Sequence, residues 1–191
     1  MEMSYSPPEQ KKYKQVPVGT HTAICYMIVD IGTQKVTYEG EETLKRQIII
    51  GWETPDETTD DGKPLSIIKT YTLSFNEKAV LAKDYKAWVK DSTPNKFNLG
   101  ALLGMGCNLN IGITSGGNAK VTGVSALKAK EKVPELVAEP VCFDMRNPSE
   151  DALSRLPGFI KEKILASPEY QDYVLNSGKS VGDVLDDQIP F

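Results

Sequence analysis

The sequence predicts a mainly β fold with added helices, in which a five-stranded, partly open barrel carries a helix between its third and fourth strands. Five strand-like segments lie between residues 18 and 127, and one helix-like segment separates the third from the fourth. A second helical stretch follows the barrel. The chain has 191 residues, 40% hydrophobic and 25% charged, which fits one medium domain with an extension.

The first two predicted strands form the longest part of the barrel. Val18–Ile31 is rich in β-branched residues, and its length suits a coiled strand shared by both halves of a small barrel. We expect residues 34–40 to extend it as a ribbon. The second strand is Leu44–Glu53. Alternate residues of that strand share one face: Arg46, Ile48, Ile50 and Trp52.

The third strand leads directly into a helix. An acidic loop containing Pro and Gly, residues 54–64, precedes the strand Ile67–Phe75. Asn76 is placed to cap a helix over Glu77–Val89, because apolar residues recur there at helical spacing. The predicted buried face of this helix consists of Val80, Leu81, Tyr85, Trp88 and Val89.

Two further strands complete the predicted barrel. A short helix capped by Asn98 is expected through Leu103. Strands then follow over Cys107–Thr114 and Ala119–Leu127, and residues 115–118 join them as a hairpin turn. The polar residues 128–140 predict a loop.

The rest of the chain is organised around this barrel. Helical patterns over residues 149–174 are interrupted at Pro157 and Pro168, and the sequence leaves open whether they cover the barrel, contact a second subunit or position the chain end. We divide the chain into a flexible N-terminal arm (1–15), a barrel domain (16–145), a helical extension (146–175) and an acidic C-terminal tail (176–191).

The order of elements is that of an OB-fold, a barrel that binds oligonucleotides on its second and third strands and in the flanking loops. Several motifs add to this order: Asp30-Ile31-Gly32, Ile50-Gly51-Trp52-Glu53-Thr54-Pro55, Lys69-Thr70-Tyr71-Thr72-Leu73-Ser74-Phe75, the helix Glu77–Val89 and Leu102-Leu103-Gly104-x-x-Cys107. Through these motifs residues 16–127 resemble phage-encoded single-stranded DNA-binding proteins. The resemblance implies sequence-independent binding of single-stranded DNA and a phage origin.

The C-terminal tail ends in an acidic run followed by an apolar tip, Asp186-Asp187-Gln188-Ile189-Pro190-Phe191. An exposed apolar tip is disfavoured unless something covers it, which fits docking into an apolar pocket ringed by cations. The stretch resembles the C-terminal tip of bacterial single-stranded DNA-binding proteins, which implies recruitment of replication, recombination and repair proteins. Folding back of Phe191 onto the chain's own core is the alternative. The predicted partner-binding residues are Asp183, Asp186, Asp187, Ile189, Pro190 and Phe191.

Binding of a single strand without sequence preference needs cations that follow the phosphates and aromatic rings that stack on the bases. Both residue types occur on the second and third strands, in the first loop and around the last strand. The predicted DNA-binding residues are Lys35, Tyr38, Lys45, Arg46, Trp52, Lys69, Tyr71, Lys120 and Lys128.

Several of the aromatic residues have a structural alternative. Trp52 alternates with two isoleucines and therefore fits the core as well as a groove. Tyr71 shares its face with Lys69, which favours exposure, although apolar residues follow on the same side. We expect Phe75 and Trp88 to lie in the core.

The net charge of −4, from 22 basic and 26 acidic residues, taken alone argues against nucleic acid as a ligand. Three aspartates of the tail carry much of it, so the body is nearly neutral and can hold a basic groove if its charges are segregated. No apolar run is long enough for a membrane span, and the N-terminus lacks the order of a signal peptide. We expect a cytoplasmic protein, in the host bacterium if phage-encoded.

The residue types argue against an enzyme. One histidine, His21, and three widely spaced cysteines, Cys25, Cys107 and Cys142, form no triad or metal spacing. We expect no catalytic residue, metal or cofactor, with His21 structural and the first two thiols buried. Two alternatives stay open: a protein–protein adaptor on the same barrel with weak or no DNA binding, and a small metal-dependent nuclease. A homo-oligomer is also compatible with the sequence.

Overall fold

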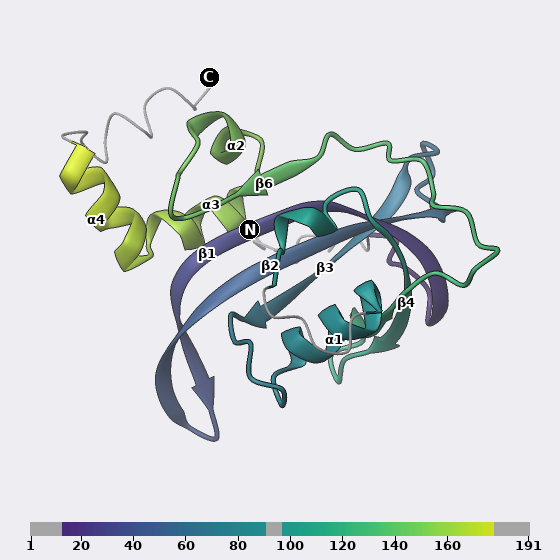
Figure 1. The fold of residues 1–191 in the computed structure, drawn as a ribbon, viewed down its shortest axis with the longest axis horizontal. Helices are drawn as coiled ribbons and strands as arrows, with labels where there is room; N and C mark the ends of the chain where they lie inside the picture. Colours follow the sequence, from purple (N-terminus) through teal and green to yellow (C-terminus); the bar gives the residue numbers. More distant parts are fainter. Residues whose placement is uncertain (1–12, 91–96, 178–191) are drawn as a thin grey trace, which may run out of the picture.

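A computed structural model describes residues 13–90 and 97–177 of the chain. Within these residues it contains six strands, four α-helices and one short 3₁₀ turn (Figure 1). Their bounds are β1 Gly19–Tyr38, β2 Glu41–Thr58, β3 Pro64–Thr72, α1 Val80–Val89, η1 Gly100–Leu102, β4 Gly106–Ile113, β5 Ala119–Ser125, β6 Val141–Phe143, α2 Glu150–Ser154, α3 Gly158–Leu165 and α4 Pro168–Ser177.

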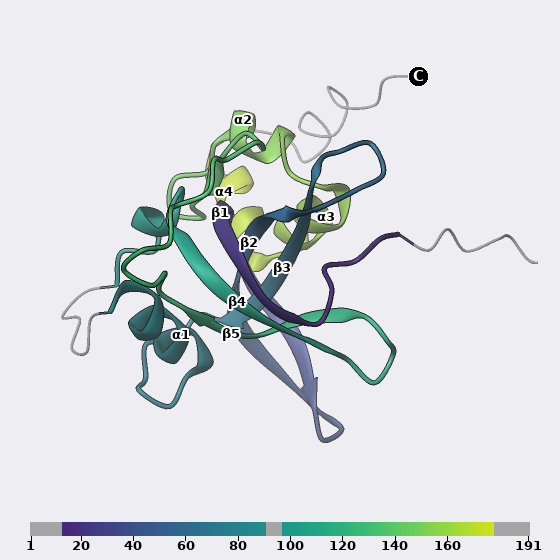
Figure 2. The same cartoon turned by 90° about the vertical axis from the view of Figure 1, so that its right-hand side faces the viewer.

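The strands form one open, mostly antiparallel sheet. The hydrogen-bonded order is β3-β2-β1-β4-β5, and β6 adds to β1 as a parallel strand. The sheet curls so that β3 and β5, the two ends of this path, contact each other, although no hydrogen-bonded pairing joins them within the described residues (Figure 2). The chain is therefore β-rich, as predicted.

Strand β1 is the centre of the sheet because it pairs with three other strands. Its first residues pair with β4 up to Ile24, and Met27–Val29 pair with β6 along the same edge. The ladder with β2 shifts register between Cys25 and Met27 and again between Asp30 and Thr33. Such bulges bend a strand and increase its twist. One strand can thus take part in the curled sheet and still hold the C-terminal part of the chain.

The inner face of the curled sheet carries the larger of two apolar cores. Alternate residues of β1 and β2 point into it, as the period of two in a strand requires. Helix α1 covers this core, and its Trp88 Nε1 donates a hydrogen bond of 3.0 Å to the carbonyl oxygen of Gly106. Core residues of these elements are Ala23, Cys25, Ile28, Ile48, Ile50, Trp52, Leu81, Tyr85 and Trp88.

The outer face of β1 and β2 carries a second core under the C-terminal helices. Met27, Val29, Ile31 and Ile49 are at most 1% exposed there. β6 and the three helices α2–α4 cover them, so the helical extension lies on the opposite side of the sheet from α1 (Figure 1). Residues 149–174, whose role the sequence left open, therefore pack against the sheet.

The breaks between the helices lie where the sequence predicts them. Ser149 caps α2, since its hydroxyl accepts a hydrogen bond from the backbone N–H of Ala152. Pro157 precedes α3, and Pro168 opens α4 at a position where a missing N–H costs nothing. None of the helices in the described part of the chain is long and apolar enough to cross a membrane.

Several predicted boundaries differ from the structure. Strand β2 continues to Thr58 instead of ending at Glu53, with Pro55 inside a register shift where its missing N–H is tolerated. Strand β3 ends at Thr72, because the N–H of Ser74 bonds back to the carbonyl of Thr72 and turns the chain. Helix α1 begins at Val80, three residues after the predicted start.

Candidate nucleic-acid interface

Beyond the sheet, β1 and β2 continue together as a two-stranded ribbon, residues 33–46, which projects from the body (Figure 1). Tyr38 pairs with Glu41, so Glu39 and Gly40 form a two-residue turn. Both have positive φ, 52° and 85°, as a type I′ hairpin turn requires. The predicted ribbon is therefore present, and it is continuous with β1.

The ribbon carries two of the predicted cations on opposite sides. Lys35 pairs with Leu44, and Lys45 pairs with Gln34, so the two lysines point to different faces. Both are exposed; Lys35 Nζ lies 4.0 Å from Glu42, whereas Lys45 has no ion pair among the described residues. The side chain of Tyr38 lies outside what the structure describes. Both lysines are accessible to phosphate.

Arg46 at the base of the ribbon is already engaged. Its Nη2 lies 2.6 Å from Asp30 Oδ2, and this hydrogen bond raises the pKa of the guanidinium. A second pair, Arg146 and Asp144, is close enough to act on the first electrostatically, and the hydrogen bond from Arg146 lowers the pKa of Asp144. Arg46 therefore fixes the base of the ribbon and offers less to DNA than predicted.

Lys69 and Tyr71 do share one face, but it is the face toward α1. Lys69 Nζ lies 2.7 Å and Tyr71 Oη 2.8 Å from the same carboxylate oxygen of Asp84. Lys69 also lies over the tyrosine ring, 4.8 Å from its centroid. Tyr71 is only 3% exposed, and burial together with Asp84 raises its pKa. Tyr71 is too buried to stack on a base, so that prediction is wrong, whereas Lys69 is partly exposed but already paired with Asp84.

Trp52 belongs to the core rather than to a groove. Its exposure is 0%, and its ring centroid lies 5.8 Å from that of Trp88. The indole Nε1 is buried and has no hydrogen-bond partner among the residues that the structure describes. Of the two alternatives that strand alternation left open, the structure selects the buried one.

The hairpin between β4 and β5 presents the remaining predicted cations. Lys120 is exposed and forms no ion pair within the described residues, and Lys128 follows β5 with its side chain 85% exposed, 3.9 Å from Glu131. The N-terminal segment packs beside this hairpin, because Gln15 accepts a hydrogen bond from Ala119 N–H and bonds Asn118. The hairpin is therefore held by the N-terminal segment and exposes one accessible cation, Lys120.

An aromatic row that the sequence did not predict packs against α1. Tyr85 of α1 is buried, Phe97 packs 4.7 Å from it, and Phe75 stacks on Phe97 at 4.6 Å with the planes 30° apart. Phe75 is 47% exposed, although alternation along the third strand predicted it in the core. The turn after Thr72 removes Phe75 from that alternation. Its position before the polar pair Asn76-Glu77 was the available signal.

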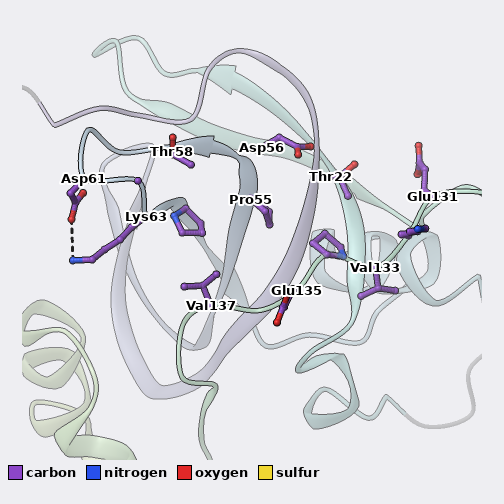
Figure 3. A pocket seen from close by; sticks show the side chains of 14 residues that line it. Thr22, Pro55, Asp56, Thr58, Asp61, Lys63, Glu131, Val133, Glu135 and Val137 are labelled. Atoms are coloured by element: carbon purple, nitrogen blue, oxygen red, sulfur yellow. Dashed lines mark ion pairs between the residues drawn. The ribbon is translucent and has the colours of Figure 1, made fainter.

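A hollow of about 630 Å³ on the described surface has mostly acidic charged residues in its lining (Figure 3). The β2–β3 turn, the start of β1 and the loop 131–137 line it. Its charged lining residues are Asp56, Asp61, Lys63, Glu131, Lys132 and Glu135. Lys63 is already paired with Asp61 at 3.0 Å, so the remaining charge is negative. Phosphates are repelled here, and we assign no nucleic-acid contact to this cleft.

Other predicted features are resolved in part. Cys25 and Cys107 are free and buried as expected, whereas Cys142 is exposed. Among the described residues no three His, Cys, Asp or Glu side chains gather as a metal site. His21 bonds the carbonyl oxygen of Pro17 and lies near Glu57, which is a structural environment. The tail residues Asp183, Asp186, Asp187, Ile189, Pro190 and Phe191 lie outside the described residues.

No protein-family model matches the chain, and no curated protein matches it at a significant level.

Proposed function

We propose that the protein binds single-stranded DNA without sequence preference and without catalysing a reaction, as the phage-encoded proteins that it resembles do. In this proposal the curled sheet is an OB-fold, and the acidic C-terminal tip recruits replication, recombination or repair proteins in the bacterial cytoplasm.

The observation that carries the proposal is the strand path. An OB-fold has five strands in the order β3-β2-β1-β4-β5, with a helix after β3, and its ends approach each other to close the barrel. The described chain has that order, has α1 in that place and brings β3 against β5. Its β1–β2 and β4–β5 hairpins project where such barrels hold oligonucleotides.

The accessible cations give the proposed binding surface. Lys35 and Lys45 of the ribbon and Lys120 of the β4–β5 hairpin are exposed, and each can contact a phosphate without losing a buried partner. Phosphate contacts release counterions, which makes affinity fall with salt. Phosphate contacts therefore contribute more to the proposed binding than the sequence predicts, because the buried Trp52 and Tyr71 do not stack on bases.

An adaptor function is the second candidate. The burial of Trp52 and Tyr71 favours it, because two of the rings expected to stack on bases are in the core. In an adaptor the tail would recruit partners while the barrel bound DNA weakly or not at all.

Salt-resolved titration of an oligo-dT strand separates the two candidates. The expected result is a negative log–log slope of several units for the native chain, with duplex DNA a poor competitor. Lys35→Glu combined with Lys45→Glu should weaken binding and reduce the slope by about two, since about one unit is lost per phosphate contact.

Lys63→Glu combined with Lys132→Glu is the matched control, because it changes the net charge equally but at the acidic cleft. That cleft includes Thr22, roughly 40 Å along β1 from Lys35. Equal losses for the two double variants would show only a general charge effect. Absence of oligo-dT binding at low salt would favour the adaptor, and metal-dependent degradation of the strand would indicate a nuclease.

A further inference from the structure

The aromatic row described above is built so that only its outer end is open. Tyr85 is 8% exposed and accepts a hydrogen bond of 3.3 Å from the N–H of Asn98, the residue after Phe97. Phe97 is held between Tyr85 and Phe75, with ring centroids 4.7 and 4.6 Å away. Phe75, at 47% exposure, therefore presents a ring that is already oriented before any ligand arrives.

A backbone hydrogen bond joins the segment that leads to Phe75 to the base of the ribbon. The N–H of Leu73 donates to the carbonyl oxygen of Arg46 at 2.8 Å, so the chain leaves β3 along the base of the ribbon. Phe75 follows two residues later, and Lys45 is the neighbour of Arg46. The segment between β3 and α1 therefore starts at the base of the ribbon, which projects from the sheet (Figure 1).

The segment that carries Phe75 is also cationic. Residues 74–90 contain four lysines against Glu77 and Asp84, and Asp84 is already bound by Lys69 and Tyr71. Lys78 and Lys83 are exposed and form no ion pair within the described residues. The segment that carries Phe75 thus starts at the base of the ribbon and leads to exposed cations around the start of α1.

We propose that Phe75, supported by Phe97, stacks on a base of bound single-stranded DNA, while Lys45 and Lys78 contact the neighbouring phosphates. The proposal rests on the proposed function and assigns the stacking residue that Trp52 and Tyr71 do not supply. A flat ring face flanked by cations suits any of the four bases, since each has a π-face, and it gives no sequence preference.

The test compares Phe75→Ala with the native chain on two probes, oligo-dT and an abasic strand of the same length. Loss of a stacked base should weaken oligo-dT binding roughly five- to a hundredfold and leave binding of the abasic strand unchanged. Phe75→Trp should restore the affinity for oligo-dT, and its added fluorescence should be quenched on binding.

Phe159→Ala is the matched control, because Phe159 is equally exposed, at 50%, but belongs to α3 on the other side of the sheet. It should bind both probes as the native chain does. Equal weakening of Phe75→Ala on both probes would identify a structural role and overturn the proposal. If the native chain binds oligo-dT and Phe75→Ala binds it equally well, the stacking proposal alone is overturned. If the native chain does not bind oligo-dT, the proposed function is overturned as well.

Discussion

Asp84 of helix α1 binds Lys69 and Tyr71 of strand β3, two residues that the sequence predicts to contact DNA. Its carboxylate accepts a hydrogen bond from the ammonium of Lys69 and another from the hydroxyl of Tyr71, at 2.7 and 2.8 Å. Lys69 and Asp84 are 17% and 15% exposed, so both charges are largely removed from water. Removing one partner of such a pair costs more than the pair contributes, because a buried charge is left uncompensated.

Tyr71→Phe should therefore lower stability and leave DNA binding unchanged. Loss of one hydrogen bond to a carboxylate is expected to cost about 1–3 kcal/mol of the free energy of unfolding. Urea denaturation gives the stability and oligo-dT titration the affinity. Reduced affinity in a variant of native stability would return Tyr71 to the binding surface.

The three cysteines differ in reactivity by position. Burial raises the pKa of Cys25 to about 12 and also raises that of Cys107, so both thiols stay protonated near pH 8. Partial desolvation raises the pKa of the exposed Cys142, which slows its reaction without preventing it.

Maleimide at pH 8 should therefore label Cys142 alone in the folded chain, and all three cysteines after denaturation. The labelling rate at Cys142 should rise with pH as its thiolate fraction increases. Mass spectrometry of the labelled peptides measures both. Rapid labelling of Cys25 in the native chain would contradict its burial in the inner core.

At the residue scale, alternation predicts which residues share a face but not which face is covered. Lys69 and Tyr71 do share a face, as predicted, and α1 covers that face. The prediction that Phe75 lies in the core extends the strand past Thr72, whereas the backbone hydrogen bond from Ser74 to Thr72 turns the chain there. Exposure depends on tertiary contacts, which local sequence does not contain.

At the element scale, the base of the ribbon is locked to the helical extension. Glu169 at the start of α4 accepts a hydrogen bond of 2.8 Å from the N–H of Thr33, and Gln34 Nε2 donates to the carbonyl oxygen of Lys163 at 3.0 Å. Between them Gly32, at φ +69°, lies against Ser167, where an added Cβ would come within 2.7 Å of the serine side chain. The bulge of β1 and the turn between α3 and α4 thus form a single joint.

Gly32→Ala should destabilise the chain through two effects, a strained positive φ and a steric clash. The conformational part alone is worth about 1–2 kcal/mol. Gly62→Ala is the matched control, because Gly62 has φ +79° but nothing within 4 Å of an added Cβ. Thermal melts of both variants isolate the clash as their difference. Equal losses of stability in the two variants would mean that the structure around Gly32 accommodates the added Cβ without an energetic penalty.

Elements with long sequence patterns were predictable, whereas the short strand β6 was not. Leu44–Glu53 and Ala119–Leu127 largely coincide with β2 and β5, and the helical breaks at Pro157 and Pro168 are confirmed. Strand β6 was missed because three residues carry no periodicity, and its pairing with β1 joins segments far apart in sequence. The first strand was predicted to end at Ile31, before Gly32, whereas β1 continues through its bulges into the predicted ribbon.

At the scale of the whole molecule, the tail predicts a measurable competition. Removing Asp186–Phe191 should abolish partner recruitment and leave DNA affinity unchanged or higher, because an acidic segment on the same chain would compete with DNA for the cations. Phe191→Ala should lose most partner affinity, as a central apolar anchor does, and leave the charge competition unchanged. Salt-resolved oligo-dT titration and a pull-down from host extract test both variants. Weaker DNA binding after truncation would show instead that the tail is structural.

The two faces of β1 are covered at very different times during synthesis. Met27, Val29 and Ile31 leave the ribosome early, but β6 and α2–α4, which cover them, follow more than a hundred residues later. Until those elements are synthesised, the growing chain exposes an apolar strand face, and exposed apolar surface promotes association with other chains. Chaperone demand and translation speed therefore bear on the yield of this protein more than on one whose strands are covered by their neighbours in sequence.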